Sequence, residues 1–256
     1  MDLTTSYPRA FSESTLERYE FREVRNAAAI LTATNPDLAV EIEAVLAEFA
    51  LRTADLVNAG GSESKLAKRV NGSFRSRGWR EARVDTDIDL KLRIYPYAPA
   101  GEKKAIVTST QVSNEGYKVD NFKGRVALDL EWNAKDGNLD RDISAYRALY
   151  DAGLIDVAVL ITRTQTDLRE LGTRLRIEAG VDPEEAKKVL GTSTTTNLDK
   201  LLPRLTRGDG GGCPILVVAI CARTWDENAV EPVDEEVAED ETVVDDEPVV
   251  EVDAEA

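Results

Sequence analysis

Histidine is absent from the 256 residues of this chain. Without it, the chain cannot build a Ser-His-Asp or Cys-His catalytic arrangement, a His-Cys zinc site, or a nuclease site that uses a histidine base. Cysteine is scarce as well, because the two residues present are too few for a disulfide framework. These residues, Cys213 and Cys221, lie in or beside an apolar segment, so we expect buried thiols in a reducing cytoplasm.

Long hydrophobic runs are also missing. No apolar run approaches the roughly 20 residues of a membrane span, and neither end resembles a secretory signal. Apolar residues nevertheless make up 42% of the chain, which is enough for a substantial core. The composition therefore predicts a cytoplasmic protein with one large domain.

The charge is unevenly distributed along the chain. Residues 226–256 contain 15 acidic side chains and no Lys or Arg, whereas residues 1–225 carry a net charge of only −1. The overall charge of −16 therefore describes an appendage, and it does not exclude nucleic-acid binding by the rest. We expect a domain over residues 1–225 and a disordered acidic tail over residues 226–256.

The hydrophobic pattern predicts a helical N-terminal part, over about residues 1–80. One helix is expected over residues 16–31. Another should begin at Asn35-Pro36-Asp37, which combines a capping residue, a proline in the first turn and an acid near the positive end of the helix. Apolar residues at helical spacing continue this second helix to Leu56.

The rest of the chain, over about residues 84–221, predicts a sheet with helices. Residues 88–94 alternate apolar and polar side chains, as in a half-buried strand, and further strands are expected at 105–110, 125–132, 154–162 and 214–221. A helix over residues 140–150 connects two of these strands by a crossover long enough for a parallel pair. The last strand should close the sheet. The fold class is therefore α/β (α+β), with a mixed central sheet flanked by helices.

Two carboxylates and an amide in this region suggest a metal site. Asp120 comes just before the strand expected at 125–132, and Glu131 lies near its far end. Without histidine, hydrolysis of a phosphodiester needs oxygen ligands that hold Mg²⁺, which polarises the phosphate and lowers the pKa of an attacking water. Asn133, two residues after Glu131, is expected on the same face of the strand. As a neutral amide it could orient this water but not take its proton. The bland alternative is an ordinary strand end with solvated polar groups.

The segment around these residues resembles a known family. Lys118-Val119-Asp120, Arg125-Val126-Ala127, Glu131-Trp132-Asn133-Ala134-Lys135-Asp136 and Asp140-Arg141-Asp142 are similar to the core of the BglII-type restriction endonucleases, which are related to BamHI and to the wider PD-(D/E)xK nucleases. Weaker similarity extends over most of residues 20–221.

The resemblance implies a restriction-endonuclease-like core and a homodimer that cuts a palindromic DNA site. It also implies that Asp120 and Glu131 bind the metal, Mg²⁺ with Mn²⁺ as a substitute, and that the backbone carbonyl of Trp132 completes the protein ligands. Asn133 stands where the superfamily commonly has Lys, which leaves the general base unassigned, and Lys135 is an alternative. Glu81 is expected to be a helix-borne acid near the site, or simply a surface glutamate.

DNA contacts are harder to place from the sequence. Phosphate contacts need Lys or Arg, and two groups of basic residues qualify. The first contains Lys65, Lys68 and Arg69, and the second contains Lys200 and Arg204. For each group a solvated helix face is an equally good interpretation.

The leading hypothesis is a Mg²⁺-dependent, type II-like restriction endonuclease that acts on short double-stranded DNA sites. Such a protein is expected in a prokaryotic cytoplasm, together with a cognate DNA methyltransferase. Two alternatives stay open: a structure-specific or repair nuclease on the same core, and a non-catalytic DNA-binding relative. The sequence does not reveal the recognition site or the cut position.

Overall fold

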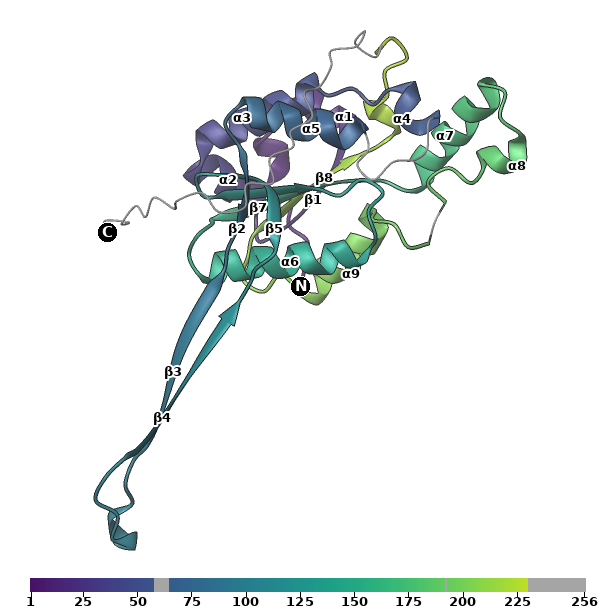
Figure 1. Cartoon of the computed structure of the whole chain (residues 1–256). Coiled ribbons are helices and arrows are strands. Elements are labelled where there is room, and N and C mark those ends of the chain that lie inside the picture. The colour runs from purple at the N-terminus through teal and green to yellow at the C-terminus, as the bar shows by residue number, and fades with distance from the viewer. Residues whose placement is uncertain (58–64, 192, 230–256) are drawn as a thin grey trace.

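The fold is a six-stranded mixed sheet with helices on both faces and a long two-stranded arm (Figure 1). The computed structural model describes residues 1–57, 65–191 and 193–229. The sheet has the order β1-β8-β7-β6-β5-β2. Its strands are β1 (Tyr19–Val24), β2 (Arg80–Arg83), β5 (Lys118–Lys123), β6 (Val126–Leu130), β7 (Val157–Arg163) and β8 (Ile215–Ile220). This arrangement confirms the predicted fold class.

The middle of the sheet is parallel and its flanks are antiparallel. β6 pairs with β7 and β7 with β8 in parallel, while β1, β5 and β2 join by antiparallel pairs. Helix α6 (Gly137–Asp151) connects β6 to β7, which confirms the predicted parallel crossover. Every residue of β7 and β8 is buried, because helices cover both faces there. The expectation that β8 is the last strand at this edge of the sheet is wrong, because β1 pairs with β8 and forms the edge itself.

Two helical layers enclose the sheet. The first packs side chains of α2 (Ala27–Thr34), α3 (Pro36–Glu48), α5 (Lys65–Ser76) and α7 (Thr166–Glu178) against one face. α6 and α9 (Leu198–Arg207) pack against the other face (Figure 1). The short helices α1 (Glu13–Arg18), α4 (Thr53–Val57) and α8 (Pro183–Ala186) and three 3-10 turns, η1 (Tyr7–Arg9), η2 (Ala98–Ala100) and η3 (Ala222–Thr224), complete the described elements.

The N-terminal part contains a strand as well as helices. The helix predicted over residues 16–31 is wrong, because β1 lies between α1 and α2. Phe21 of β1 belongs to the core and pairs with Val218 of β8, so tertiary pairing overrides a spacing that also suits a helix. The helix starting at Asn35-Pro36-Asp37 is confirmed as α3, but it ends at Glu48 and a separate α4 carries Leu56.

The segment predicted as a half-buried strand of the sheet forms an arm instead. β3 (Thr86–Ile94) and β4 (Ile106–Asn114) pair only with each other, and every residue of both strands is exposed. Figure 1 shows this hairpin extending far from the body. The period-two pattern correctly predicts a strand, but nothing in the pattern reveals that its apolar side has no partner among the described residues.

The acidic tail falls almost entirely outside the described residues, which end at 229. Across the part of the chain that the structure describes, no helix combines the length and the apolar character needed to cross a membrane. Cys213 and Cys221 are both buried and free, as expected.

A buried glutamate connects the N-terminal segment to the sheet. Glu23 of β1 is fully buried, and its carboxylate accepts hydrogen bonds from the backbone N–H of Ala28, at 2.8 Å, and from the N–H and hydroxyl of Ser6. Ala28 lies in the first turn of α2, whose N–H groups have no partners within the helix. The carboxylate therefore satisfies donors that burial would otherwise leave unpaired.

We expect Glu23→Ala to lower the free energy of unfolding by about 2–3 kcal/mol, because it leaves buried donors unsatisfied. Urea unfolding monitored by circular dichroism measures this change. Glu20→Ala is the matched control, since Glu20 lies on the same strand in a partly exposed ion pair with Arg22 and should cost less than about 1 kcal/mol. Equal losses from both variants would contradict the assignment.

Candidate active site

Four carboxyl groups gather between strands β5 and β6 and helix α6. They belong to Asp120 on β5, Asp129 on β6, Glu131 just after β6, and Asp142 on α6. Asp129, Glu131 and Asp142 are buried, and Asp120 is half-buried. Four acids so close together in a largely desolvated place cannot all be ionised without cost, so the cluster favours a cation.

The hairpin of β5 and β6 fixes two of these acids through reciprocal bonds. The backbone N–H of Asp120 donates to Oδ1 of Asp129 at 2.7 Å, and the Asp120 carboxylate accepts a hydrogen bond from the backbone of Leu130. The other oxygen of Asp129 accepts the hydroxyl of the fully buried Tyr146 at 2.6 Å. The Asp120 carboxylate is thereby held beside the residue that precedes Glu131.

The other two acids meet at the start of α6. The carboxyl of Asp142 acts on both Asp120 and Glu131 and raises their pKa values. Arg141 lies 3.2 Å from Asp142 and 3.9 Å from Glu131, measured from guanidinium nitrogen to carboxylate oxygen. Its side chain stays 43% exposed, so one accessible cation borders the buried acids.

The buried acids hold protons more tightly than acids in water do. Burial raises the pKa of Asp129 to about 8, and the charges of Asp142 and Asp120 add to the effect. Burial raises the pKa of Glu131 to about 9, with Asp142 as the next cause. The pKa of Asp142 is raised as well, mainly by burial, although a hydrogen bond with Glu131 and then the charge of Arg141 oppose the shift. Each shift reports the cost of placing a negative charge here without a compensating cation.

The chemistry of these groups fits a hard divalent cation. Oε2 of Glu131 and Oδ2 of Asp142 are buried and accept no hydrogen bond from an N–H or hydroxyl donor, although the two carboxyl groups bond to each other when one of them is protonated. Carboxylate oxygens are the ligands that Mg²⁺ prefers, and a cation would satisfy such unpaired atoms. Within residues 1–57, 65–191 and 193–229, however, no three His, Cys, Asp or Glu side chains already converge as a finished metal shell. The carboxylate oxygens therefore lie near one another, but they do not form a complete ligand shell.

The structure corrects the position expected for Asn133. The strand alternation that places Asn133 on the face of Glu131 is wrong, because β6 ends at Leu130 and Asn133 has a left-handed backbone, with φ of 58°. Asn133 is exposed, and its Oδ1 accepts Nε of Arg163 at 3.1 Å. Lys135 is also exposed and lies outside the strand, with its backbone bridged to Thr195. The same reasoning therefore does not place Lys135 on that face.

The segment that follows β6 is held in place by packing on the other face of the sheet and by backbone hydrogen bonds of Glu131. Trp132 is 7% exposed and belongs to the core beneath the other sheet face. The backbone N–H of Glu131 donates to Ile161 at 2.8 Å, and its carbonyl accepts the hydroxyls of Thr162 and Thr196. Glu131 thus keeps a fixed backbone although it follows the last paired residue of β6.

A comparison with protein families identifies the family of this chain. The model of the restriction endonuclease BglII/BglIII family matches residues 19–220, most of the chain. The chain belongs to this family. No curated protein matches it.

Membership of the BglII/BglIII family gives the acidic site a chemical context. The family consists of restriction endonucleases, so the chain is an endodeoxyribonuclease whose substrate is DNA. Such enzymes generally use divalent metal ions, and the carboxylate cluster lies inside the matched range.

Sequence reasoning missed two acids of the candidate site, although both left a signal. Asp129 is the one charged residue within the apolar run of β6, and it lies two residues before Glu131. Asp142 lies on the apolar side of α6, at helical spacing from the buried Leu139 and Tyr146. A charge at a position that the pattern assigns to the core indicates a buried functional group.

The Glu81 expectation is wrong in one respect. Glu81 lies on β2 rather than on a helix, and it forms an ion pair with Lys118 at 2.7 Å. Its charge also raises the pKa of Asp120, after burial and Asp142. Glu81 therefore lies at the edge of the acidic cluster.

Members of both basic groups proposed for DNA contact bind acidic or carbonyl groups of the chain. Arg69 forms two hydrogen bonds with Asp55, at 3.0 and 2.9 Å, and Arg204 forms two with Asp140, at 2.6 and 2.8 Å. Lys200 donates to the carbonyl of Ser193 and lies 3.6 Å from Asp136. The remaining members, Lys65 and Lys68, are exposed on α5.

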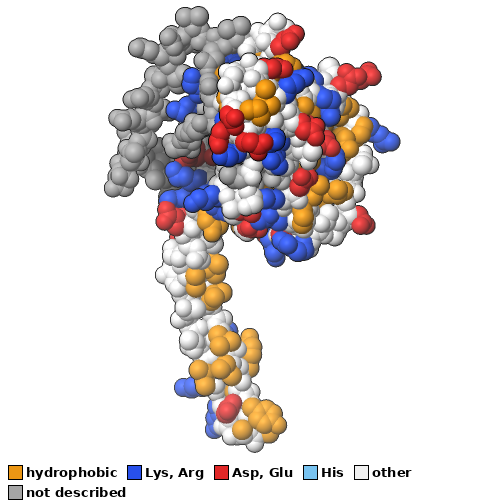
Figure 2. Space-filling model, turned by 90° about the vertical axis from the view of Figure 1, so that its right-hand side faces the viewer, with side chains coloured by type: hydrophobic (Ala, Val, Ile, Leu, Met, Phe, Trp, Pro, Cys, Tyr) orange, Lys and Arg blue, Asp and Glu red, His pale blue; other side chains and the backbone are white. Residues whose placement is uncertain are grey.

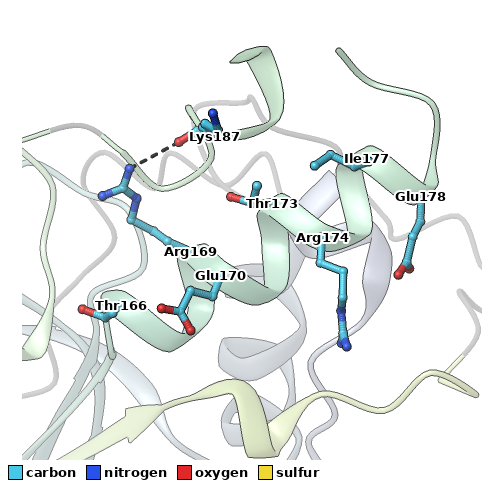
Figure 3. Close-up of a pocket in the computed structure, with 8 residues that line it drawn as sticks. All are labelled: Thr166, Arg169, Glu170, Thr173, Arg174, Ile177, Glu178 and Lys187. Carbon is cyan, nitrogen blue, oxygen red and sulfur yellow. Dashed lines mark hydrogen bonds between the residues drawn. The ribbon is translucent and has the colours of Figure 1, made fainter. Parts of the chain in front are cut away.

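A separate hollow of about 690 Å³ lies on the outer side of α7. Figure 3 shows its side chains projecting from α7 and from Lys187, with Arg169 donating to the Lys187 carbonyl. Its lining mixes cations with Glu170 and Glu178 and includes none of the four clustered acids. This hollow is therefore separate from the acidic cluster between β5, β6 and α6.

The raised pKa values predict how stability depends on pH. Between their ordinary values near 4 and the folded values of about 8 and 9, Asp129 and Glu131 hold protons in the folded state that the unfolded chain has released. Their contribution to stability is therefore complete below pH 4 and is lost as pH rises to about 9. Each extra proton gives a slope of about 1.4 kcal/mol per pH unit.

We expect Asp142→Asn to make this loss shallower, because it removes the neighbouring charge that acts most on Glu131. The measurement is the free energy of unfolding of the full chain with EDTA, from pH 5 to 9, for the wild type and the variant. Asp151→Asn, at an exposed position of the same helix, is the control and should follow the wild type. A wild-type slope retained in Asp142→Asn would refute the electrostatic interpretation.

Proposed function

We propose that this chain is a Mg²⁺-dependent, type II-like restriction endonuclease that cuts both strands of a short DNA site as a homodimer. The observation that carries the proposal is the set of four clustered acids, two of which have buried oxygen atoms that no N–H or hydroxyl donor reaches. A structural cluster would be expected to satisfy those atoms internally. Membership of the restriction endonuclease family supports DNA as the substrate.

In this proposal Asp120, Glu131 and the backbone carbonyl of Trp132 hold the metal. When bound, Mg²⁺ supplies charge that polarises the scissile phosphate and lowers the pKa of the attacking water. Asp129 is a positioning residue in this proposal. It fixes the backbone of Asp120 by accepting its N–H, and it accepts the hydroxyl of Tyr146. The pair thus positions the first ligand without a flexible joint.

Asp142 is the fourth acid of the proposed site. Its carboxyl faces both Asp120 and Glu131, so it either contacts the metal directly or holds a water that does. Arg141 is exposed beside it and can neutralise charge on a phosphate oxygen of the bound DNA. Divalent charge and one guanidinium would together offset the repulsion within the cluster.

Asn133 and Lys135 complete the proposed site from the loop that leaves Glu131. Both are exposed, so water and DNA can reach them. The bond from Arg163 fixes the orientation of the Asn133 amide, which can align a water but cannot take its proton. Lys135 carries a cation that could stabilise the developing phosphate charge.

Contacts to the DNA backbone are proposed for the basic groups on α5 and α9. Lys65 and Lys68 are exposed on α5, and Arg69, Lys200 and Arg204 would exchange their present acidic or carbonyl partners for phosphates. A restriction activity also requires protection of the host genome. A cognate DNA methyltransferase is therefore the proposed partner in the cell.

We expect Asp120→Ala and Glu131→Ala to reduce cleavage by at least about 10²–10³-fold while specific DNA binding largely survives. A panel of plasmids incubated with Mg²⁺ or Mn²⁺ measures cleavage, and fluorescence anisotropy with Ca²⁺ measures binding. Asp151→Ala is the matched acidic control and should cut like the wild type.

The pattern of products separates the possible functions. Discrete, reproducible fragments support sequence-specific restriction, whereas smears or nicks indicate a structure-specific or repair nuclease. Undiminished cleavage by Asp120→Ala and Glu131→Ala would reject the site. No cleavage by the wild type with either metal, together with no stabilisation by metal, would leave a non-catalytic DNA-binding protein.

A further inference from the structure

A fully buried arginine lies at the end of β7. Arg163 has no exposed surface, whereas Figure 2 shows Lys and Arg side chains at the surface of the body, interspersed with Asp and Glu. Burial lowers the pKa of Arg163 to about 10, and the charge of Arg169 adds to the effect. The hydrogen bonds that Arg163 donates all go to uncharged oxygen atoms. A buried guanidinium with only neutral partners is costly, so the side chains that it holds should account for its presence.

These partners belong to three loops that meet at one end of the sheet. Nε of Arg163 donates to Oδ1 of Asn133, in the loop after β6, and one Nη donates to the hydroxyl of Thr195, both at 3.1 Å. The other Nη donates to the side-chain oxygen of Gln165, where α7 begins. The loops of Asn133 and Thr195 also pair with each other through backbone hydrogen bonds of 2.8 Å. Arg163 therefore fixes side chains of a loop whose backbone is already held.

The bond to Arg163 decides which atom of the Asn133 amide is left for a ligand. A guanidinium only donates hydrogen bonds, so the amide must turn its oxygen toward Arg163. Its nitrogen then faces away from the guanidinium, and no residue in the described part of the chain accepts a hydrogen bond from it. Asn133 is exposed, so solvent and DNA can reach this nitrogen. Asn133 is therefore a hydrogen-bond donor at the surface.

The amide oxygen is also turned away from the acidic cluster. Alternate residues of a strand point to opposite faces of the sheet, and Arg163 continues the series of β7 that ends at Ile161 in the core beneath α7. Asp129 and Glu131 lie on the other face, where side chains of α6 act on both. The oxygen of Asn133 is therefore not directed at a water bound among these acids.

We propose that Asn133 donates a hydrogen bond to a phosphate oxygen of the bound DNA and that Arg163 is its positioning residue. The inference rests on the proposed function, in which DNA is cut beside Glu131, and it narrows the role of Asn133 to that of a donor. Asn is among the residues that bind the DNA backbone, and a phosphate oxygen is a charged acceptor that strengthens the bond.

A base edge fits this amide less well than a phosphate does. Asn reads adenine by presenting its oxygen and its nitrogen together to one base. Here the oxygen faces the buried Arg163, so the nitrogen alone is offered to DNA. A single donor carries little sequence information, whereas it suits any phosphate oxygen. We therefore expect Asn133 to contribute to the affinity for DNA of any sequence.

Asn133→Asp tests the donor, because it should affect DNA binding and stability in different directions. The carboxylate keeps an oxygen for Arg163 and gives it an anionic partner, so the Tm should not fall. The same change removes the N–H donor and places a negative charge beside the phosphate, so the Kd for duplex DNA should rise more than about tenfold. Fluorescence anisotropy of the full chain with Ca²⁺ measures this Kd.

Asn228→Asp is the matched control for the added charge. Asn228 is exposed and lies outside the residues 19–220 that the family model matches. This variant should bind DNA like the wild type. Equal binding by Asn133→Asp and Asn228→Asp would overturn the proposal.

A double-mutant cycle tests the positioning role of Arg163. Asn133→Ala removes the donor without adding charge and should raise Kd and KM about 2–10-fold. Arg163→Lys keeps a positive charge but loses the planar fork, so it should cause a loss of similar size. Together the two changes should weaken binding no more than Asn133→Ala alone, because Arg163 acts on DNA through Asn133. Additive losses would mean a merely structural role. The Tm of Asn133→Asp still tests the Arg163 contact if Arg163→Lys does not fold.

Two further outcomes would assign Asn133 to another partner and overturn the proposal. A lower kcat in Asn133→Ala with an unchanged Kd would assign it to the attacking water. A loss of binding confined to the DNA site that the enzyme cuts would assign it to a base edge, whereas equal losses on cut and uncut duplexes support a phosphate. Either failure would leave the proposed nuclease standing, because metal-dependent cleavage and its loss in Asp120→Ala are measured separately.

Discussion

The site of this protein depends on the pairing of β5 with β6 and on the acids that this pairing buries. Asp129 accepts the backbone N–H of Asp120, and the Asp120 carboxylate in turn accepts a bond from the Leu130 backbone. Because α6 covers the same side, water cannot fully solvate these charges. The strand pair is therefore both a structural joint and the source of the electrostatic repulsion that a cation would relieve.

The acids proposed for the function are also the residues that lower the stability of the folded chain. Buried acids with raised pKa values weaken a folded protein at neutral pH, and a structural role alone would be met as well by apolar side chains. Tyr146 satisfies one oxygen of Asp129, but one oxygen each of Glu131 and Asp142 accepts no bond from an N–H or hydroxyl donor. Such a pattern is typical of sites where a ligand completes the hydrogen-bonding and charge balance.

The arm shows the opposite design. It contributes nothing to the two cores that enclose the sheet, and its strands contact each other rather than the body. It leaves the body beside Lys118 and Glu81, at the sheet edge that also carries Asp120. The base of the arm therefore lies close to the acidic cluster, because Glu81 bonds to Lys118 and its charge acts on Asp120.

The sequence by itself determined the parallel β6-α6-β7 unit, the family, and the importance of Asp120 and Glu131 as a pair of acids worth attention. Local patterns suffice there, because period-two and helical spacings report burial directly. Only the tertiary structure decided that Asp129 and Asp142 join them, that β6 stops before Asn133, and that residues 86–114 leave the sheet. The reason is physical: alternation tells which side of a strand is apolar, but the partner of that side is fixed by contacts between segments distant in the chain.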